Sequence, residues 1–373
     1  MASAVMKSPR SVDVEITTSC NLRCAYCSHF SGPGDVEADL PLAAWLRFFA
    51  ELRRLAVMTV TLSGGEPFHR PDLREVIHGI VTNRMRFSVL SNGTLIDPDT
   101  AAFLASTGRC NHVQVSIDGA IDITHDAFRG EGNFRKAIQG IRNLRQCNVP
   151  VTVRVTIHRK NVRELEAVAR LLLEEIGLPS FSTNSASPLG LCRKNAAQTQ
   201  LTVAERSLAM ETLLRLDERY GGRISATAGP LAEGHAWREM VEAHRKGERM
   251  ADRGFLTGCN GPRQTIAVRA DGAIVPCLQL GHMVLGTITA DDLGDVWRNH
   301  PDLRTLRARP EIPLASFAFC RDCTYRDFCT GNCPAIAYTL RGEVNHPSPD
   351  ACLRLFLEQG GRLPGRAARR TAG

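Results

Sequence analysis

The chain has 373 residues, of which 43% are apolar and 23% charged, a composition typical of a globular protein with about two domains. No apolar run reaches the ~18 residues of a membrane span, and the first residues lack the apolar stretch of a signal peptide, so we expect a cytoplasmic protein without membrane contact. The formal net charge is +7, but the chain lacks a dense basic block, which argues against nucleic acid as a partner.

Strand-like and helix-like segments alternate through the first half of the chain. Helical patterns separate the strands; one places Leu42, Trp45, Phe49 and Leu52 on a single face. Repeated alternation implies parallel strands joined by crossover helices. We therefore predict an α/β fold containing a partial (β/α)6 TIM-like barrel. Its six predicted strands are 12–17, 56–63, 86–91, 112–118, 151–158 and 180–186.

The pattern changes after a further predicted helix, whose start is marked by the capping-box pair Thr202 and Glu205. The following residues are Gly-rich and irregular, and the C-terminal part has few periodic segments but seven cysteines. A small domain of that kind usually needs metal to hold its fold. The predicted organisation is a core domain at 1–230, a linker at 231–256, a cysteine-rich domain at 257–360 and a basic, disordered tail at 361–373.

Thirteen cysteines are unusual for a chain of this length, and an odd number without an export signal argues against a disulfide framework. Clustered cysteines in a reducing compartment more often bind metal. Three of them, Cys20, Cys24 and Cys27, have the spacing CxxxCxxC just after the first predicted strand. Three thiolates can hold three irons of a [4Fe–4S] cluster and leave the fourth iron open. A zinc site completed by His29 is the weaker alternative, because zinc sites usually show paired CxxC motifs.

Polar, Gly-rich motifs follow the next three predicted strands. They are "SGGEP" at 63–67, "SNGTL" at 91–95 and "SIDG" at 116–119. The carboxyl ends of parallel strands meet at one rim, where active sites of such folds lie. Each motif alone also reads as a turn, but four motifs at successive strand ends indicate a shared site.

The CxxxCxxC motif followed by "GGEP" resembles the radical S-adenosylmethionine (SAM) enzymes, and the resemblance extends over roughly residues 10–220. It implies that SAM fills the open iron position of a [4Fe–4S] cluster. One electron from the reduced cluster then breaks a C–S bond of SAM homolytically. The resulting 5′-deoxyadenosyl radical abstracts a hydrogen atom from the substrate. A flavodoxin- or ferredoxin-type protein is the implied electron donor.

The resemblance also implies SAM contacts in the first half of the barrel. Tyr26 matches the aromatic residue near the adenine. Gly64 and Gly65 would let the backbone approach the ligand closely. Glu66 would accept a hydrogen bond from the SAM ammonium group.

Further contacts are implied for the next two strand ends. Asn92 would meet the methionine end of SAM. Ser116 and Asp118 match a pair that meets the ribose. Arg129 resembles the arginine that pairs with the SAM carboxylate, although it also reads as an ordinary surface charge.

All seven C-terminal cysteines resemble those of the SPASM domain, which extends one branch of the radical SAM family. The resemblance implies two auxiliary Fe–S clusters. The first would use Cys259, Cys277 and Cys333, and the second Cys320, Cys323, Cys329 and Cys352. The first set lacks a fourth Cys, so an open iron, a non-Cys group such as Asp252, or a smaller cluster remain alternatives.

SPASM enzymes largely act on peptides or proteins, so the resemblance implies oxidative modification of a peptide or protein, most like the peptide-maturase branch. Leu278 stands where sulfatase maturases carry Asp, which counts against that activity. Only 19 residues precede Cys20, so we expect leader recognition by a separate protein or by the barrel itself. Alternatives are a radical SAM dehydrogenase or epimerase of an aminosugar or other small molecule, and a non-catalytic zinc-binding module.

Three cysteines lie outside these motifs. Cys192 follows the sixth predicted strand, and its thiol would be placed to donate a hydrogen atom to a substrate radical. A buried, unreactive thiol is the alternative for Cys192. Cys110 and Cys147 have no neighbouring cysteines in the sequence, and we expect them in the core.

Overall fold

The computed structural model describes residues 5–29, 39–259 and 261–365. In this part of the chain ten strands form one sheet in the order β10-β9-β8-β1-β2-β3-β4-β5-β6-β7. Strands β1 to β8 pair in parallel, whereas β9 and β10 are antiparallel to their neighbours. The strands are β1 (Ser11–Glu15), β2 (Thr59–Ser63), β3 (Arg86–Ser91), β4 (Cys110–Ser116), β5 (Val151–Ile157), β6 (Phe181–Ser185), β7 (Ile224–Ala226), β8 (Thr265–Val268), β9 (Ala273–Val275) and β10 (Gly286–Thr287).

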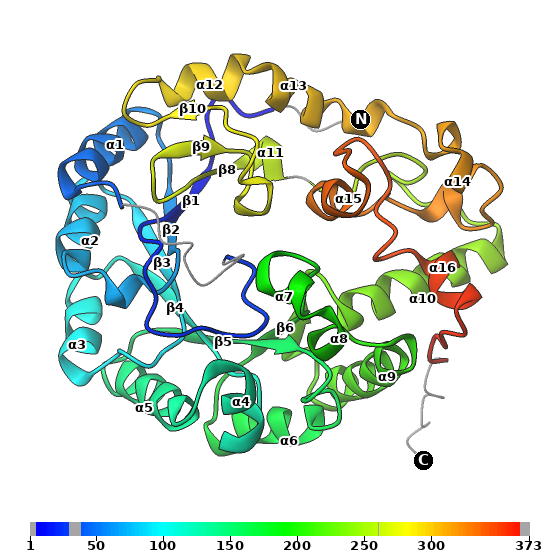
Figure 1. Ribbon diagram of the computed structural model, residues 1–373, viewed down its shortest axis with the longest axis horizontal. Helices are drawn as coiled ribbons and strands as arrows, with labels where there is room; N and C mark the ends of the chain where they lie inside the picture. Colours follow the sequence, from blue (N-terminus) through cyan, green and yellow to red (C-terminus); the bar gives the residue numbers. More distant parts are fainter. Residues whose placement is uncertain (1–4, 30–38, 260, 366–373) are drawn as a thin grey trace.

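Helices surround the curved sheet, and the loops at its carboxyl rim fill the centre of the ring in Figure 1. The first group is α1 (Leu42–Arg54), α2 (Leu73–Thr82), α3 (Pro98–Ser106), α4 (Asp122–Arg129), α5 (Asn133–Gln146), α6 (Leu165–Arg170), α7 (Gly190–Lys194) and α8 (Ala196–Thr199). The second group is α9 (Val203–Arg219), α10 (Pro230–Lys246), α11 (Gly261–Gln264), α12 (Leu293–Asn299), α13 (Pro301–Arg307), α14 (Ala318–Arg321), α15 (Pro334–Arg341) and α16 (Leu353–Glu358).

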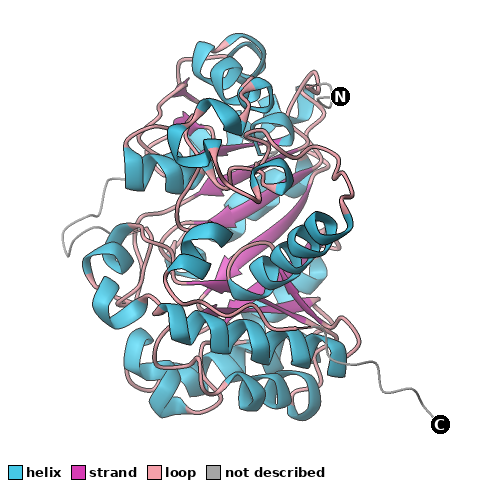
Figure 2. Cartoon of the chain, turned by 90° about the vertical axis from the view of Figure 1, so that its right-hand side faces the viewer, coloured by secondary structure: helices cyan, strands magenta, loops and turns pink. Residues whose placement is uncertain are grey.

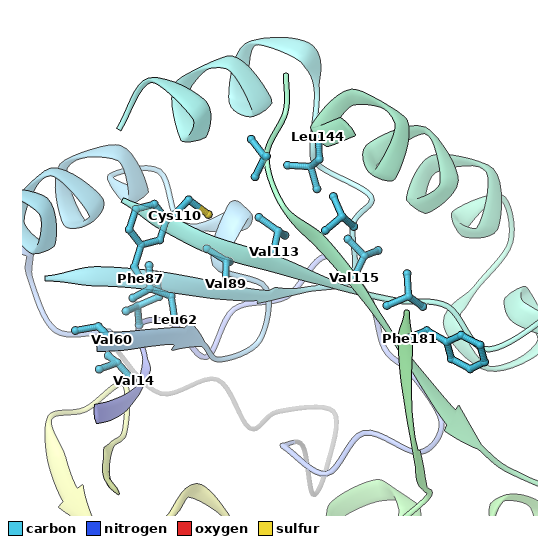
Figure 3. Packing of buried hydrophobic residues seen from close by; sticks show 14 of the residues in the cluster. Val14, Val60, Leu62, Phe87, Val89, Cys110, Val113, Val115, Leu144 and Phe181 are labelled. Atoms are coloured by element: carbon cyan, nitrogen blue, oxygen red, sulfur yellow. The ribbon is translucent and has the colours of Figure 1, made fainter. Parts of the chain in front are cut away.

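The core follows from the spacing of the apolar residues, which is every second residue along a strand and every third or fourth along a helix. Along β5, Val151, Val153, Val155 and Ile157 are buried, while the alternate residues are half-buried and face the other side of the strand. Valines of neighbouring strands line up in the same way beneath the helices (Figure 3). The outer face of the sheet therefore makes the core, and the inner face is left for polar residues.

The predicted (β/α)6 barrel with parallel strands is confirmed, and every predicted strand overlaps an observed one. Cys110 lies in the hydrophobic core, and Cys147 packs against it, as expected. The sheet extends further than predicted, because β7 is added at one end and β8 to β10 at the other. Strand β8 pairs with β1, so the cysteine-rich segment begins as a continuation of the barrel sheet.

The segment predicted as a linker, 231–256, is helical for most of its length, because α10 occupies Pro230–Lys246. Its role as a linker between domains remains a prediction. In α10 the buried Leu231 packs in the barrel core, whereas Trp237 and Met240 pack in a second cluster with Phe356. The surrounding glycines had obscured this helical period. Figure 2 shows the long helices lying along the strands on this side of the sheet.

The C-terminal segment divides into two parts. Residues 361–365 pack on the barrel helices: the Arg362 N–H donates to Ser207 Oγ, and Arg238 donates to the carbonyl oxygens of Pro364 and Gly365. The rest of the tail predicted to be disordered, 366–373, lies outside the described residues. Among the described helices, none has the length and apolarity needed to cross a membrane.

Candidate functional site

A cavity of about 290 Å³ opens at the carboxyl rim of the sheet. The thiols of Cys20, Cys24 and Cys27 all line it, so the structure brings together the three predicted cluster ligands. Each ligand of a [4Fe–4S] cluster binds a different iron, so the three thiols need not converge on one point. In the described residues no three His, Cys, Asp or Glu side chains group closely enough for a single metal ion. The three thiols thus fit the thiolate donor set of an iron–sulfur cluster.

The loop that carries these thiols is anchored on three sides. The Gly65 and Glu66 N–H groups donate to the Thr17 and Ser19 carbonyls at 2.9 Å each. Further along the loop, the Ala25 N–H donates to a carbonyl of α4, and the Leu191 N–H of α7 donates to the Cys27 carbonyl. Because its backbone is bonded to β2, α4 and α7, the loop is held in place by the barrel.

Gly64 and Gly65 line the cavity, but their lack of side chains serves a second purpose. A Cβ on Gly64, whose φ is 134°, would lie 2.2 Å from the Thr17 carbonyl oxygen. A Cβ on Gly65 would lie 2.2 Å from the Ser19 carbonyl oxygen. These contacts require glycine for the close approach of the cysteine loop to β2. The predicted close approach to SAM remains a prediction.

Glu66 lies behind the cavity wall with 1% of its surface exposed. Its carboxylate accepts hydrogen bonds from Ser91 Oγ at 2.8 Å, from the Asn92 N–H at 2.7 Å and from the Phe68 N–H at 3.2 Å. Burial raises the pKa of Glu66 to about 7, although these donors oppose the shift. The side chain therefore joins the ends of β2 and β3. Its contact with the SAM ammonium remains a prediction.

Asn92 lines the cavity and organises the loop after β3. Its Oδ1 accepts from the Thr94 N–H at 2.9 Å, and its Nδ2 donates to Asn21 Oδ1 at 2.9 Å. Asn21 in turn donates to Thr94 Oγ1. Because Asn21 stands directly after Cys20, this triangle ties the cysteine loop to β3, a role that sequence reasoning did not assign.

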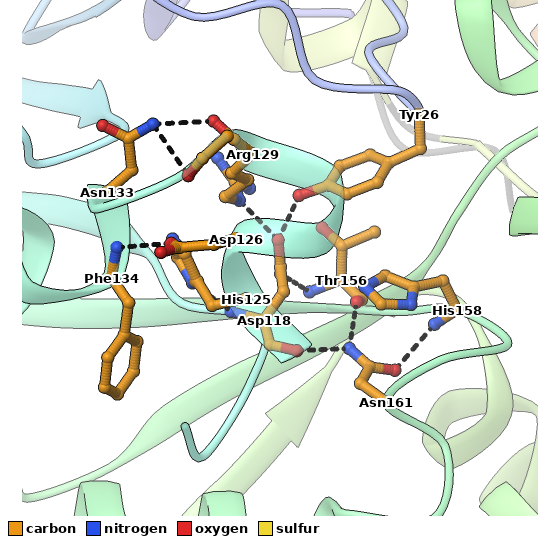
Figure 4. A network of polar contacts seen from close by, with 11 residues as sticks. Tyr26, Asp118, His125, Asp126, Arg129, Asn133, Phe134, Thr156, His158 and Asn161 are labelled. Carbon is orange, nitrogen blue, oxygen red and sulfur yellow. Dashed lines mark hydrogen bonds and ion pairs between the residues drawn. The ribbon is translucent and has the colours of Figure 1, made fainter. Parts of the chain in front are cut away.

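Asp118 is the centre of a buried polar network (Figure 4). Its side chain is 0% exposed, and Tyr26 Oη and Arg129 Nε both donate to its Oδ2. Its Oδ1 accepts from the Thr156 N–H at 2.7 Å. Burial is the largest single effect and would raise the pKa of Asp118, but Arg129, His158, His125 and the Tyr26 hydroxyl together lower it. The carboxylate is therefore ionised at neutral pH.

The two donors of this network both reach the cavity. Tyr26 and Arg129 line it, and the Arg129 guanidinium carbon lies 5.4 Å from the centre of the Tyr26 ring. Asp118 itself is not among the lining residues in the described part of the chain, whereas Ser116 is. Asp118 thus orients Tyr26 and Arg129, two predicted SAM contacts, from outside the cavity wall. Its own contact with the ribose remains a prediction.

Sequence reasoning missed several residues of the cavity wall, among them Asn184 and Gln279. Asn184 of β6 lines the cavity, and its buried Oδ1 has no hydrogen-bond partner in the described residues. Gln279 comes from the cysteine-rich segment, 95 residues further along the chain. The alternation in β6 could have indicated Asn184, because it shares the inward face with Ser182. No local pattern marks Gln279, which arrives through the tertiary fold.

Cys192 of α7 is fully buried. It packs in one cluster with Tyr26, Phe128 and Ala186, and its sulfur lies 3.4 Å from Thr199 Oγ1. Among the described residues it does not line the cavity. This placement favours packing, and the hydrogen-atom donor role remains a prediction.

The Cys192→Ala variant separates these roles. Because the thiol packs behind Tyr26, we expect product formation to be retained and stability to fall by about 1–2 kcal/mol through the small void. Product yield, 5′-deoxyadenosine yield and the thermal midpoint of the loaded enzyme measure the two effects. Loss of product with persisting SAM cleavage would instead support the donor role.

Cys259, Cys277 and Cys333 lie together in the C-terminal segment. The pKa of the Cys277 thiol is raised to about 12, mainly by burial and to a smaller extent by the neighbouring thiols of Cys259 and Cys333. Cys277 and Cys333 also pack against the same buried residues, Leu280 and Ala335. The structure thus assembles the predicted first auxiliary set from three distant positions.

A second group of thiols forms separately. Burial raises the pKa of Cys320 to about 12, with further contributions from Cys329, Cys352 and Cys323. The same four cysteines were predicted to hold the second auxiliary cluster. Buried thiols with raised pKa values remain protonated in the metal-free chain, so cluster binding must release their protons. Both groups fit thiolate-bound iron–sulfur clusters, with their ligand roles still predictions.

Comparisons with known proteins agree with this arrangement. Residues 14–172 match the radical SAM superfamily model, and residues 259–324 match the model of the SPASM iron–sulfur cluster-binding domain. The AdoMet-dependent heme synthase of Methanosarcina barkeri is 27% identical over 93% of this chain and 97% of its own length. The PqqA peptide cyclase of Methylocella silvestris is 26% identical over 90% of this chain and 86% of its own length.

A solved structure shows the same fold. The crystal structure of Streptococcus suis SuiB bound to the precursor peptide SuiA superposes with a TM-score of 0.71 at 15% identity. The match covers 94% of this chain and 77% of SuiB. The two family models together span more than half of the chain. The first covers Cys20, Cys24, Cys27 and most of the cavity wall, and the second covers Cys259, Cys277, Cys320 and Cys323. The chain therefore belongs to the radical SAM superfamily, carries a SPASM domain and uses SAM and iron–sulfur clusters as cofactors.

Proposed function

We propose that this radical SAM enzyme oxidatively modifies a peptide. One observation carries the proposal: Gln279 lines both the cavity and a second groove of about 430 Å³ that lies at the surface. The groove is lined by residues of α7 and α15, and both helices lie inside the ring in Figure 1. A chain-like substrate lying in this groove could reach the cavity past Gln279.

The lining of the groove suits a peptide. Tyr338 and Leu340 expose 38% and 39% of their surfaces there. The Tyr338 ring is stacked on His282, with ring centres 3.8 Å apart, so it offers a fixed apolar surface. Arg193, Gln279 and Thr339 add polar groups for backbone or side-chain contacts. Aromatic anchors among polar groups are typical of peptide-binding surfaces.

The chain's own residues would bind and orient the reactants. Tyr26 and Arg129, both fixed by Asp118, face the cavity where SAM would lie, and Arg129 carries the charge that suits its carboxylate. The loaded cluster supplies the electron for reductive cleavage of SAM. Asn184 offers a buried, unpaired carbonyl oxygen to either reactant.

The electrons of the proposed reaction balance. One electron and SAM give methionine and the 5′-deoxyadenosyl radical, which takes a hydrogen atom from the peptide. The peptide radical then loses one electron and a proton to form the new bond. An auxiliary iron–sulfur cluster is the acceptor class for this electron. The net change is a two-electron oxidation of the peptide.

A second candidate is a haem-type small molecule. The observation that favours it is the AdoMet-dependent heme synthase, whose match extends over nearly the full length of both chains. Such a ligand would need to enter the same cavity, because Cys20, Cys24 and Cys27 line it.

Isotope transfer distinguishes the two candidates. The anaerobically loaded enzyme is reduced with dithionite and given SAM with either of two probes. The first is a set of perdeuterated synthetic peptides encoded by short reading frames beside the gene, and the second is a deuterated iron porphyrin. We expect deuterium in 5′-deoxyadenosine with a peptide. Transfer from the porphyrin with none from any peptide would overturn the proposal.

The groove itself is tested by Tyr338→Ala. Loss of an aromatic anchor should reduce kcat/KM for the peptide about tenfold or more, because such residues contribute about 2 kcal/mol at binding surfaces. SAM cleavage without peptide should be unchanged. The matched control is Ile123→Ala on α4, which removes an apolar side chain that is 77% exposed outside the groove. Equal peptide kinetics for both variants would exclude the groove as the substrate path.

A further inference from the structure

Arg309 is a buried cation in an unusual setting. It begins a 3₁₀ turn, Arg309–Glu311, and only 2% of its surface is exposed. Its Nη1 donates to the Val344 carbonyl. Its Nε and Nη2 are buried without a hydrogen-bond partner, and no carboxylate in the described part of the chain pairs with it. A buried guanidinium with two open donors is costly unless a negative group compensates it.

The titratable groups that act on Arg309 are two thiols of the first C-terminal group, Cys259 and Cys333. Burial lowers the pKa of Arg309, and Cys259 and Cys333 act in the opposite direction. The interaction is mutual, since Arg309 favours the thiolate of Cys259. The packing agrees with this: Val344, whose carbonyl accepts from Arg309, packs against the same buried cluster as Cys277 and Cys333. The guanidinium thus lies close to the thiols of the set that lacks a fourth cysteine.

We propose that Arg309 is the cationic partner of the iron–sulfur cluster held by Cys259, Cys277 and Cys333, donating N–H hydrogen bonds from Nε and Nη2 toward its sulfur atoms. The cluster would supply the negative charge and acceptors that the arginine lacks. Arg309 would in turn offset the charge of the thiolates. The inference rests on the SPASM domain and does not depend on the substrate.

This partnership has a consequence for redox chemistry. Hydrogen bonds to sulfur and a nearby positive charge stabilise the reduced, more negative state of a cluster. Arg309 should therefore raise the reduction potential of this cluster relative to a neutral residue. A higher potential suits a cluster that accepts an electron from a substrate radical.

The chain offers a matched control two residues earlier. Arg307 is also buried, at 9% exposure, and also has one unpartnered nitrogen, Nη2. Its Nε donates to the Pro262 carbonyl at 2.8 Å, and its guanidinium carbon lies 4.3 Å from the Trp297 ring centre. Burial lowers the pKa of Arg307 to about 10, Arg263 adds to this effect, and no thiol contributes. Arg307 has the same charge and similar burial without the cluster neighbours.

The test is an anaerobic redox titration followed by electron paramagnetic resonance. The loaded enzyme carries alanine at Cys20, Cys24 and Cys27, so only the C-terminal clusters give signals. Arg309→Gln should move the potential of one cluster to a more negative value and leave the other unchanged. A further Cys259→Ala substitution should remove the signal that moves, which assigns it. Arg309→Lys keeps the charge, so the reduction potential of this cluster should stay close to its value in the protein with Arg309.

The remaining outcomes also decide the proposal. Arg307→Gln should leave both potentials unchanged. Unchanged potentials in Arg309→Gln, or an equal movement in Arg307→Gln, would overturn the proposal. If Arg309→Gln does not retain the cluster, its iron content should fall by one cluster and Arg309→Lys should restore it. Failure of lysine to restore the iron would show that Arg309 only packs the fold.

Discussion

Replacing Cys24 with alanine should abolish 5′-deoxyadenosine formation and remove about a third of the iron, if all three sites hold clusters of equal size. The reason is geometric. Cys24 lines the cavity together with Cys20 and Cys27, whereas the C-terminal thiols form two groups of their own. Iron and sulfide analysis of the anaerobically loaded variant, together with a dithionite-driven SAM cleavage assay, measures both effects.

Variants in the other two groups are the controls for this experiment. Cys277→Ala and Cys323→Ala should each remove one auxiliary cluster, because Cys277 interacts with Cys259 and Cys333, and Cys323 with Cys320. Both variants should still cleave SAM while losing peptide product. A single C-terminal substitution that emptied both auxiliary sites would contradict the division into two groups. Normal SAM cleavage by Cys24→Ala would contradict the cavity as the active site.

The sequence predicts the strands and their ends well, because both depend on local pattern. Alternating valines mark β5, and the polar motif after each strand must lie at the common rim once the strands are parallel. The resemblance of the C-terminal cysteines to those of the SPASM domain implies the two groups in which the structure places them. Thus Tyr26, Asn92 and Arg129 all line the cavity, although they lie far apart in the sequence.

Other features could not be read from local pattern because they depend on burial and on long-range pairing. The carboxylates of Glu66 and Asp118 are typical ligand-binding groups, yet neither is among the described residues that line the cavity, and both accept hydrogen bonds from neighbouring strands and loops. The path of the chain back to β1 through β8, which brings Gln279 to the cavity, leaves no periodic signature. Arg309 in the sequence is one basic residue among 46 Lys and Arg.

The Asp118→Ala substitution should destabilise the enzyme by about 3–5 kcal/mol, the usual cost of removing one partner of a buried ion pair. Arg129, which is 8% exposed, would keep its charge without compensation, and Tyr26 would lose the acceptor of its hydroxyl. Both side chains line the cavity, so we also expect SAM affinity to fall about tenfold or more, equivalent to about 1.4 kcal/mol. Urea unfolding of the loaded enzyme under anaerobic conditions and equilibrium SAM binding measure the two losses.

An exposed ion pair between α4 and α5 provides the control. Asp122 and Arg135 lie 3.3 Å apart, but their side chains are 42% and 83% exposed. Because solvent screens such a pair, Asp122→Ala should cost less than about 1 kcal/mol and leave SAM binding unchanged. Asp118→Asn, which keeps an oxygen acceptor but loses the charge, should fall between the two alanine variants. If Asp118→Ala destabilised the fold but bound SAM normally, Asp118 would be a structural residue alone, and the positions of Tyr26 and Arg129 would depend on other contacts.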